Sequence, residues 1–390
     1  MPPPPNAAVC RVSRGPFRDL RRCTVGSATL LSYLSGNDKQ ANAMTVIQGQ
    51  LVRGLGKAAD FTRIDWVRRQ LIEYAGIDPH PGTVNLTLGD HANRARWRSW
   101  RDLPGHVLVP ADAAFCSARC YPARIAGRIP AAVVLPEIAA YPEDKLELVA
   151  ALPVREHLSL AESALLTVEL CRPFRAKAVL FDLDGTLIDS VGAYLEVARI
   201  AAQPHGLEVT ERHVRHALAS GSNFWKDVVP KDRKDADAIM KALSAHAMRE
   251  WPRVLRERGK VFEGTARTLD AIKRLGVRLG IVSGARPEVL ELLRKDGVLD
   301  RFDSIVLGVD VSSRKPDPEG IVKCLSELGV APDAAVYVGD TPVDIQASRA
   351  AGVRAVAVLS GAGDSAMLSA HCPDRLLSSH ARLAEILEPA

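Results

Sequence analysis

The chain has 390 residues, 47% of them hydrophobic and 25% charged, which is an ordinary composition for a globular protein with room for two or three domains. Its net charge of +5 is mild, and no basic run interleaved with aromatic residues favours a nucleic-acid partner. No apolar run approaches about 18 residues, which excludes a transmembrane helix. We therefore expect small-molecule ligands, with neither nucleic acid nor membrane as a partner.

Residues 1–43 differ from the rest of the chain. They open with four prolines after Met1, carry scattered arginines, and end in the polar run Ser35–Gln40. We expect a disordered extension here. Two explanations remain open: an organelle transit peptide, since arginines are frequent and acids scarce, or a natural start at Met44.

The seven cysteines are odd in number and scattered. Cys116 and Cys120 have a loose metal-like spacing, but no second pair accompanies them. We therefore predict reduced thiols, no zinc site and a cytoplasmic location.

From Thr45 to about Leu170 the sequence predicts short strands separated by turns, with one amphipathic helix over 64–76. Many short strands with one helix favour a small β-barrel. Arg94–Arg101 is expected to be a polar passage between strands. The strands are expected at 46–52, before Leu88, and at 114–126, 131–135, 145–150 and 164–170.

Ala178–Phe181 is an apolar run bounded by polar sequence, which reads as a buried parallel strand, and Gly185 and Thr186 break the chain after it. Asp182 and Asp184 therefore lie at the carboxyl end of a strand, where open α/β sheets bind ligands. Two carboxylates this close repel each other unless a cation lies between them. The spacing thus suggests a Mg²⁺ site with one carboxylate free to attack.

Three later segments supply the rest of a phosphoryl-transfer site. A second apolar strand ends in Ser283, whose hydroxyl can bind a phosphate oxygen. Lys315 lies between an arginine and a proline and can neutralise charge on nucleophile and phosphate. A third strand ends in Asp340, and Asp344 follows four residues later.

Residues 191 to about 260 are helical in pattern and rich in charge, with helices expected over 193–202, 211–219 and 236–250. After residue 262 helices and strands alternate to Leu359, which predicts a doubly wound parallel sheet.

Residues from Ala176 onward resemble the haloacid dehalogenase (HAD) superfamily of phosphatases, since all four motifs of that family are present. The resemblance implies an α/β Rossmann-like core over 175–390 with a helical cap over about 191–260. The cap would exclude water and read the organic half of the substrate. Its candidate contact residues are Arg215, Ser220, Asn223 and Lys226.

The same resemblance implies that Asp182 is the nucleophile that forms an aspartyl-phosphate and that Asp184 is the general acid and base. Dehalogenase members lack the second acid, because a halide leaving group needs no proton. Ser283 and Lys315 would bind phosphate. Asp182, the main-chain carbonyl of Asp184, and Asp340 would hold Mg²⁺.

Residues 44–174 resemble the CTP-dependent riboflavin kinases of the archaeal type, which are built on a cradle-loop β-barrel. The resemblance lies in the glycine loop at 49–56, the Pro-Gly-Thr-Val-Asn element at 81–85, Ala131–Val134 and Val154–Glu156. It implies that Thr83 and Asn85 hold a Mg²⁺ ion that bridges nucleotide phosphate and flavin. Glu147 would lie on the flavin side, and the nucleotide contacts would come from Gly54, Leu55, Gly56, Lys57, Arg155 and Glu156.

These two resemblances predict a bifunctional flavin enzyme that joins a phosphatase to a kinase using CTP. The phosphatase substrate is either the riboflavin precursor 5-amino-6-(5-phosphoribitylamino)uracil, which we favour, or FMN. Lys57-Ala58 replaces the Glu-Gly expected of the kinase family. An alternative therefore stays open, in which the barrel only binds flavin or nucleotide and regulates a general phosphoglycolate-type phosphatase.

Overall fold

The computed structural model describes residues 46–54, 58–103, 105–112, 114–138, 141–220 and 223–388. The predicted extension over 1–43 and the nucleotide-loop residues Leu55, Gly56 and Lys57 lie outside these ranges. Residues 46–390 form one compact unit. Among the described residues, no helix combines the length and the apolar character needed to cross a membrane.

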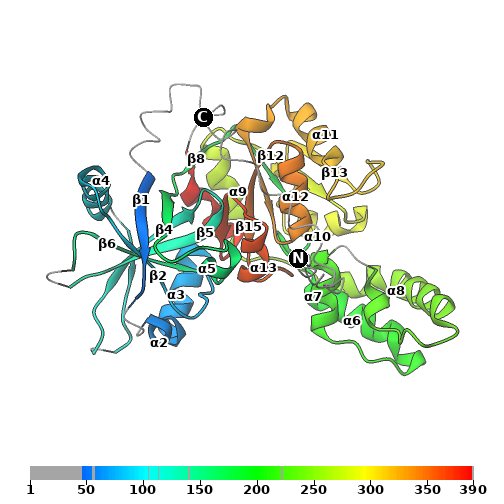
Figure 1. Ribbon diagram of the computed structural model, residues 1–390. Coiled ribbons are helices and arrows are strands. Elements are labelled where there is room, and N and C mark those ends of the chain that lie inside the picture. The colour runs from blue at the N-terminus through cyan, green and yellow to red at the C-terminus, as the bar shows by residue number, and fades with distance from the viewer. Residues whose placement is uncertain are drawn as a thin grey trace, which may run out of the picture. The chain divides into compact units, whose positions relative to one another are not determined.

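The N-terminal part of this unit is a β-barrel, as predicted (Figure 1). Strands β4, β5, β6, β2, β1 and β7 pair in this order, and β7 pairs back onto β4, which closes the ring; β3 adds to β4 from outside. Closure leaves no unpaired strand edge in the ring. The strands are β1 (Val46–Val52), β2 (Val84–Thr87), β3 (His106–Leu108), β4 (Ala118–Ile125), β5 (Ile129–Pro136), β6 (Lys145–Ala150) and β7 (Leu165–Leu170).

More helices accompany the barrel than the sequence predicts. They are α2 (Ala58–Arg63), α3 (Asp65–Ala75), α4 (His91–Arg101) and α5 (Val154–His157). The expectation of a polar passage over 94–101 is wrong, because this stretch is the end of α4. Asp90 caps that helix by accepting a hydrogen bond from Asn93 N, while Trp97 and Trp100 are buried in the barrel core. Spaced three residues apart, the two tryptophans share one helix face, which packs into the barrel.

The C-terminal part is an α/β core around a parallel sheet of order β13-β12-β9-β14-β15-β16. Every residue of β9 and β14 is buried, as expected of strands covered on both faces. The strands are β9 (Ala178–Phe181), β12 (Arg278–Ser283), β13 (Ser304–Leu307), β14 (Ala335–Gly339), β15 (Arg354–Val358) and β16 (Arg375–Leu377).

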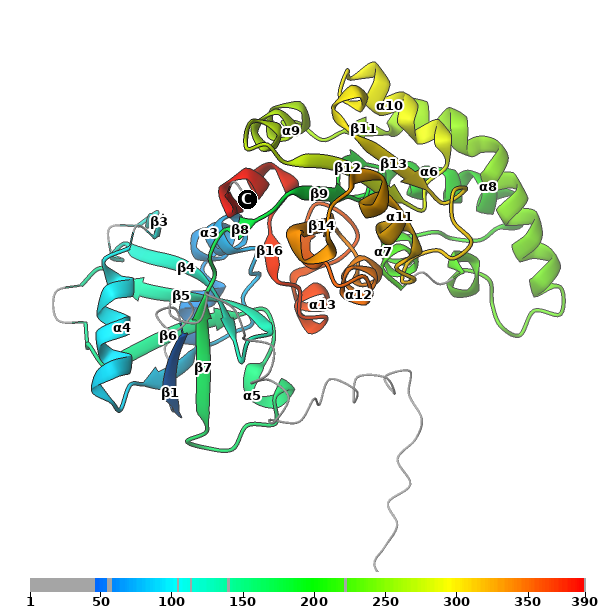
Figure 2. The same cartoon turned by 90° about the horizontal axis from the view of Figure 1, so that it is seen from above.

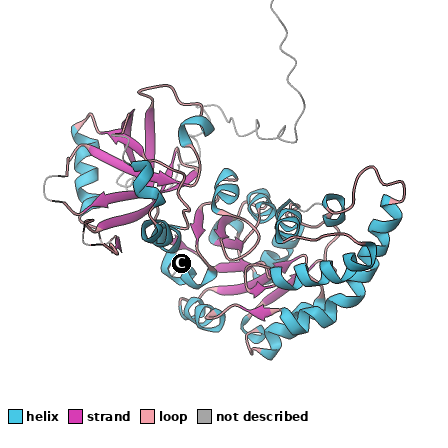
Figure 3. Cartoon of the chain, turned by 90° about the horizontal axis from the view of Figure 1, so that it is seen from below, coloured by secondary structure: helices cyan, strands magenta, loops and turns pink. Residues whose placement is uncertain are grey.

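Helices cover both faces of this sheet (Figures 2 and 3). One hydrophobic cluster joins the sheet to α9 (Thr265–Arg274) and α10 (Leu290–Lys295), and another joins it to α11 (Glu319–Leu328) and α12 (Pro342–Ala350). The predicted doubly wound core is thus confirmed. The remaining elements are α13 (Ser365–Ala370), the paired strands β8 (Phe174–Arg175) and β17 (Leu387–Glu388), and the short 3₁₀ helices η4 (Pro287–Val289), η5 (Leu299–Arg301), η6 (Pro332–Ala334) and η7 (His380–Ile386).

The helical cap is inserted between β10 (Ile188–Asp189) and β11 (Lys260–Val261). These two strands pair antiparallel, so the segment that leaves the core for the cap lies beside the segment that returns. In the described part of this insert every regular element is a helix, as Figure 1 shows for α6, α7 and α8. Helix α8 continues past its expected end at residue 250, because Val254 and Leu255 pack into buried positions. The cap elements are α6 (Val191–Ala202), η2 (Gln203–His205), α7 (Glu211–Ser220), η3 (Phe224–Asp227) and α8 (Ala236–Arg258).

The barrel and the α/β core share a hydrophobic cluster, in which Trp66 and Leu71 of α3 lie with Leu376 of β16. Ser365 adds polar contacts at this junction: its hydroxyl donates to the carbonyl of Gly76 at 2.9 Å and accepts from the amide of Asp78 at 3.1 Å. Within the compact unit the two parts are therefore packed together rather than joined by a bare linker.

The stability of the core should depend on pH through His380, which is 1% exposed and lies 2.9 Å from the Thr265 hydroxyl. Burial lowers the pKa of this imidazole from 6.5 to about 4. Below pH 6.5 this imidazole binds a proton in the unfolded chain, whereas in the folded protein it becomes protonated only near pH 4. The free energy of unfolding should therefore fall by roughly 3 kcal/mol across this interval.

Urea unfolding at pH 7 and pH 5 measures this dependence. Between pH 7 and pH 5 the wild type should lose about 2 kcal/mol through this residue, because pH 5 still lies above the folded pKa of about 4. In His380→Gln, which cannot take up the proton, the pH dependence should be smaller by that amount. The control His246→Gln, on α8, should keep the wild-type dependence. Equal slopes for His380→Gln and the wild type would show that His380 is not responsible.

Candidate active site

Three neighbouring strands of the core end in polar residues at the same edge of the sheet. Asp182 follows β9, Asp340 follows β14, and Ser283 is the last residue of β12. Because β12, β9 and β14 are adjacent and parallel, residues about 100 and 160 positions apart converge here as the sequence predicts. All three side chains are buried.

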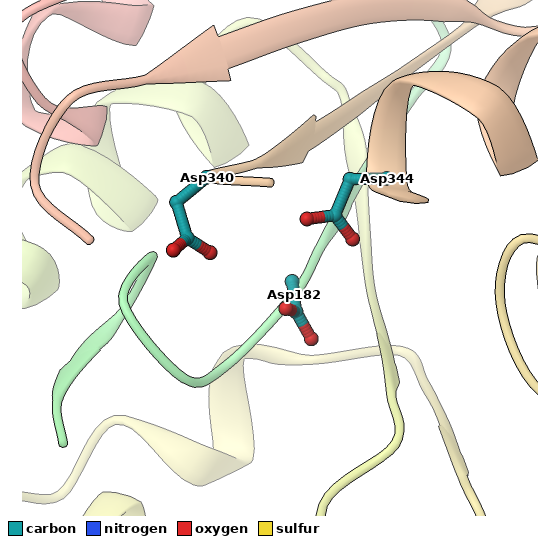
Figure 4. Close-up of side chains that lie close together, drawn as sticks. All are labelled: Asp182, Asp340 and Asp344. Atoms are coloured by element: carbon teal, nitrogen blue, oxygen red, sulfur yellow. The ribbon is translucent and has the colours of Figure 1, made fainter. Parts of the chain in front are cut away.

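Three carboxylates form the centre of the site. One oxygen each of Asp182, Asp340 and Asp344 lies within 4.8 Å of the other two. Figure 4 shows the three carboxyl groups converging from the end of β9, the end of β14 and the first turn of α12. Among the described residues this is the only group of three or more His, Cys, Asp or Glu side chains whose ligand atoms lie close enough together to hold one metal ion.

Lys315 supplies the positive charge among these acids. Its Nζ lies 3.0 Å from Asp182 Oδ1 and 2.6 Å from Asp344 Oδ1, and it donates to the Tyr337 hydroxyl at 2.9 Å. Burial by itself lowers the pKa of this lysine, but the attraction of Asp182 and Asp344 raises it well above its usual value. Lys315 is therefore charged at neutral pH.

The role of Asp344 is not evident from the sequence motifs. Its Oδ2 accepts hydrogen bonds from the Thr341 amide at 3.0 Å and the Thr341 hydroxyl at 2.6 Å, so it forms a capping box at the start of α12. Its other oxygen contacts Lys315. Asp344 is thus fully partnered, which suits a fixed counter-ion better than a metal ligand. The Thr341-Pro-Val-Asp344 spacing is the sequence signal for this cap.

Asp340 is positioned by backbone that approaches it closely. The amide of Ala362 donates to its Oδ2 at 2.7 Å, and the Thr186 hydroxyl donates to its Oδ1 at 3.3 Å. A Cβ on Gly185 or Gly361 would lie 2.4 or 2.0 Å from Asp340 Oδ2, so only glycine fits at these positions. Burial, together with the neighbouring carboxylates Asp344 and Asp182, raises the pKa of Asp340 well above its ordinary value.

Asp182 and Asp184 differ in their surroundings. Burial raises the pKa of Asp182 to about 6, an effect partly offset by Lys315. Asp184 contacts the cap, where its Oδ2 accepts a hydrogen bond from the Tyr194 hydroxyl at 3.2 Å. Burial raises the pKa of Asp184 too, against the hydrogen bonds that stabilise its charged form. Tyr194 carries no motif, and the sequence analysis missed it.

The carboxylates at the ends of β9 and β14 suit a hard divalent cation. Asp184 Oδ1 is buried and accepts no hydrogen bond, and Asp182 Oδ1 accepts none beside its ion pair with Lys315, so both oxygens can take a further cationic partner. Mg²⁺ prefers carboxylate and carbonyl oxygens. Asp182 and Asp340 offer such oxygens. The Asp184 carbonyl stays a predicted ligand.

Three of the four polar cap residues have structural contacts. Arg215 pairs with Glu211 at 2.7 Å and donates to the carbonyl of Gly361, which ties α7 to the loop around Asp340. The Ser220 hydroxyl donates within its own helix, and Asn223 caps η3. Lys226 is exposed on η3.

In the barrel, the structure places several predicted residues around a cavity of about 420 Å³. Gly54, Thr83, Asn85 and Glu147 line it. Asn85 Nδ2 donates to the Thr83 hydroxyl at 2.8 Å, and Asn85 faces Glu147 in the β2–β6 register. Burial raises the pKa of Glu147.

A second barrel cavity, of about 200 Å³, is lined by Thr83, Arg155 and Glu156 among others. Arg155 also donates to the carbonyl of Val52 at 2.9 Å, which links α5 to the end of β1. Thr83 therefore lines both cavities. Thr83 and Asn85 offer the hard hydroxyl and amide oxygens that Mg²⁺ accepts.

Comparison with known proteins agrees with both parts of this description. Residues 179–358 match the family model described as haloacid dehalogenase-like hydrolase. Residues 51–170 match a family model named for CTP-dependent riboflavin kinases and described as domain of unknown function DUF120.

Two curated relatives align with about half of this chain. The phosphoglycolate phosphatase of Xanthomonas campestris pv. campestris is 34% identical over 188 residues, covering 47% of this chain and 84% of the relative. The N-acetylmuramic acid 6-phosphate phosphatase of Pseudomonas aeruginosa is 28% identical over 189 residues, covering 48% and 83%.

Among solved structures, a haloacid dehalogenase-like hydrolase from Bacteroides fragilis is 28% identical, with a TM-score of 0.47, and aligns with 54% of this chain and 100% of that one. The chain belongs to the haloacid dehalogenase-like hydrolases, as an enzyme of their phosphatase type, and carries an N-terminal barrel of the CTP-dependent riboflavin kinase family.

Proposed function

We propose that this protein is a bifunctional enzyme of flavin metabolism. The α/β core hydrolyses a phosphate monoester through an aspartyl-phosphate on Asp182, and the barrel phosphorylates riboflavin to FMN with CTP. The observation that carries the first activity is the buried Asp182 carboxylate, which lies 3.0 Å from Lys315 and within reach of Asp340.

In the first step, an Asp182 carboxylate oxygen attacks phosphorus and the bond to the ester oxygen breaks. Asp184, whose pKa is raised by burial, gives its proton to the departing alcohol oxygen. In the second step, Asp184 takes a proton from water, and the resulting hydroxide attacks phosphorus and releases Asp182. The Tyr194 hydroxyl orients Asp184 for both transfers.

Charge neutralisation comes from two sources. Mg²⁺, held by Asp182 and Asp340 with the Asp184 carbonyl, would neutralise the phosphoryl oxygens and the carboxylates around them. Lys315 stabilises the same oxygens with its positive charge, and the hydroxyl of Ser283 binds one of them. Asp344 and Tyr337 hold the lysine in place.

The substrate class is inferred from the presence of the two domains in one chain. A flavin-binding barrel joined to a phosphatase favours a phosphorylated flavin or flavin precursor, either 5-amino-6-(5-phosphoribitylamino)uracil or FMN. The family leaves the substrate open, since its two relatives are named for phosphoglycolate and for N-acetylmuramic acid 6-phosphate.

A second candidate function is a phosphoglycolate-type phosphatase whose barrel only binds flavin or nucleotide. It is favoured by the 34% identity to a phosphoglycolate phosphatase and by Lys57-Ala58, where the kinase family has Glu-Gly. A lysine in place of a glutamate changes the charge of the nucleotide loop, and an alanine removes backbone freedom.

Asp182→Asn should reduce phosphate release from p-nitrophenyl phosphate by at least about 1,000-fold, because the amide cannot form the acyl phosphate. The barrel should still bind riboflavin with unchanged affinity, which shows that the protein is folded. Hydrolysis retained in Asp182→Asn would mean that another group is the nucleophile.

Gly361→Ala should raise the Mg²⁺ concentration needed for half-maximal hydrolysis by about tenfold or more, because the new Cβ would displace the Asp340 carboxylate. Gly192→Ala, on α6, is the matched control, since a Cβ there meets nothing within 4 Å. A magnesium titration of the two variants compares them. An unchanged midpoint in Gly361→Ala would argue against Asp340 as a ligand.

Incubation of riboflavin with CTP, and separately with ATP, should yield FMN with CTP. Thr83→Val removes the proposed ligand hydroxyl at constant shape and should lower the rate by about 100-fold or more. Thr87→Val, at the other end of β2, should leave the rate unchanged. If neither nucleotide gives FMN while the barrel binds riboflavin tightly, the barrel is a binding module.

A further inference from the structure

A cavity of about 380 Å³ lies between the cap and the core, within the usual size range of small-molecule pockets, roughly 300–1,000 Å³. Its walls come from α6, α7, η3 and α8 of the cap and from the loop after β12. The large side chains around it are Tyr194, Phe224, Trp225, Met248, Trp251 and Val289.

The cavity adjoins the reacting groups. Tyr194 lines it and also donates its hydroxyl to Asp184, the proposed acid for the leaving alcohol. Gly284 and Arg314, which line its core side, are the neighbours in sequence of Ser283 and Lys315. The organic half of an ester whose phosphate lies at Asp182 would therefore extend into this space.

The lining is unlike a site for a small acidic alcohol. Its two charged side chains are Arg286 and Arg314, both on core loops, and no acid is present in the lining. None of the polar cap residues Arg215, Ser220 and Asn223 takes part. The cap side is thus apolar, and a ligand as small as glycolate would leave it in contact with water, which forfeits the hydrophobic gain.

The aromatic side chains give the cavity flat walls. Tyr194 and Trp251 stack with ring centroids 4.4 Å apart and planes 29° apart, and Phe224 meets Trp225 edge to face at 4.7 Å. Stacked rings offer faces to which another planar ring can bind by offset or edge contacts. Such walls recognise shape and apolar area, whereas they offer few hydrogen bonds.

We propose that this cavity binds a flat, fused aromatic ring system carried by the leaving alcohol of the phosphatase substrate. The proposal rests on the phosphatase function proposed above and names its substrate class. The arginines of the core loops face the anionic phosphate end, and the aromatic cap residues face the ring. A fused ring with a hydrocarbon edge fits this lining better than a single pyrimidine, whose many polar groups would lack partners.

Three esters with the same ribityl 5-phosphate linkage test this proposal: FMN, 5-amino-6-(5-phosphoribitylamino)uracil and ribitol 5-phosphate. Because the reacting bond is identical, differences in kcat/KM report the ring alone. Assays contain Mg²⁺ and no nucleotide, so the barrel cannot remake FMN. We expect FMN to exceed ribitol 5-phosphate by about 50-fold or more, with the pyrimidine ester between them.

Met248→Glu places a charge at the exposed edge of the cavity on a helix that tolerates glutamate. The ratio of kcat/KM for FMN to that for ribitol 5-phosphate should fall about tenfold. Val322→Glu is the matched control, since Val322 is 50% exposed on α11, compared with 52% for Met248, and does not line the cavity. This control should keep the wild-type ratio.

The outcomes separate the two proposals. Equal kcat/KM for FMN and ribitol 5-phosphate, or a pyrimidine ester faster than FMN, would overturn the ring-binding cavity and leave the phosphatase intact. A ratio unchanged by Met248→Glu would also count against it. If the wild-type protein hydrolyses p-nitrophenyl phosphate but none of the three esters, the ring-binding cavity is wrong and the phosphatase function stands. If it hydrolyses none of the four, the phosphatase function itself is wrong.

Discussion

The buried charge of Lys315 is the interaction on which the candidate active site depends. Asp182, Asp340 and Asp344 crowd within a few ångströms at the edge of the sheet, and such a group of carboxylates is unfavourable without cations. Lys315 contacts two of them directly. Burial and the neighbouring carboxylates raise the pKa of the third, Asp340, and a divalent cation bound there would offset this repulsion. The lysine thus holds Asp182 in place, and the metal would complete the charge balance.

Precise backbone geometry supports this charge arrangement. Asp344 is fixed by the capping box of α12, so its free oxygen faces Lys315 in a constant position. Gly185 and Gly361 lie against Asp340 where any side chain would collide with it. Arg215 of the cap donates to the carbonyl of Gly361, so the cap is tied to the loop that positions a proposed metal ligand. Cap, loop and carboxylate are therefore mechanically connected.

The barrel and the α/β core meet through ordinary hydrophobic packing and hydrogen bonds. A shared hydrophobic cluster includes Trp66 of α3 and Leu376 of β16, and Ser365 bonds to backbone groups at Gly76 and Asp78. Those barrel residues lead directly into the loop that carries Thr83. Ser365 comes shortly after Ala362 and Gly363, whose backbone amides donate hydrogen bonds to Asp340. The fusion therefore brings supporting segments of both sites into one interface.

The sequence by itself determined the architecture and the place of the candidate acids, because short apolar runs that end in Asp182, Ser283 and Asp340 are typical of strand ends in a covered parallel sheet. It did not reveal α4, since the two buried tryptophans stand among arginines and the helix is stabilised by barrel packing. Only the tertiary structure decided that Asp344 holds Lys315, that Tyr194 contacts Asp184 and that the cap cavity is aromatic. These contacts join residues far apart in the chain, and their partners depend on how loops and helices pack, which no local pattern encodes.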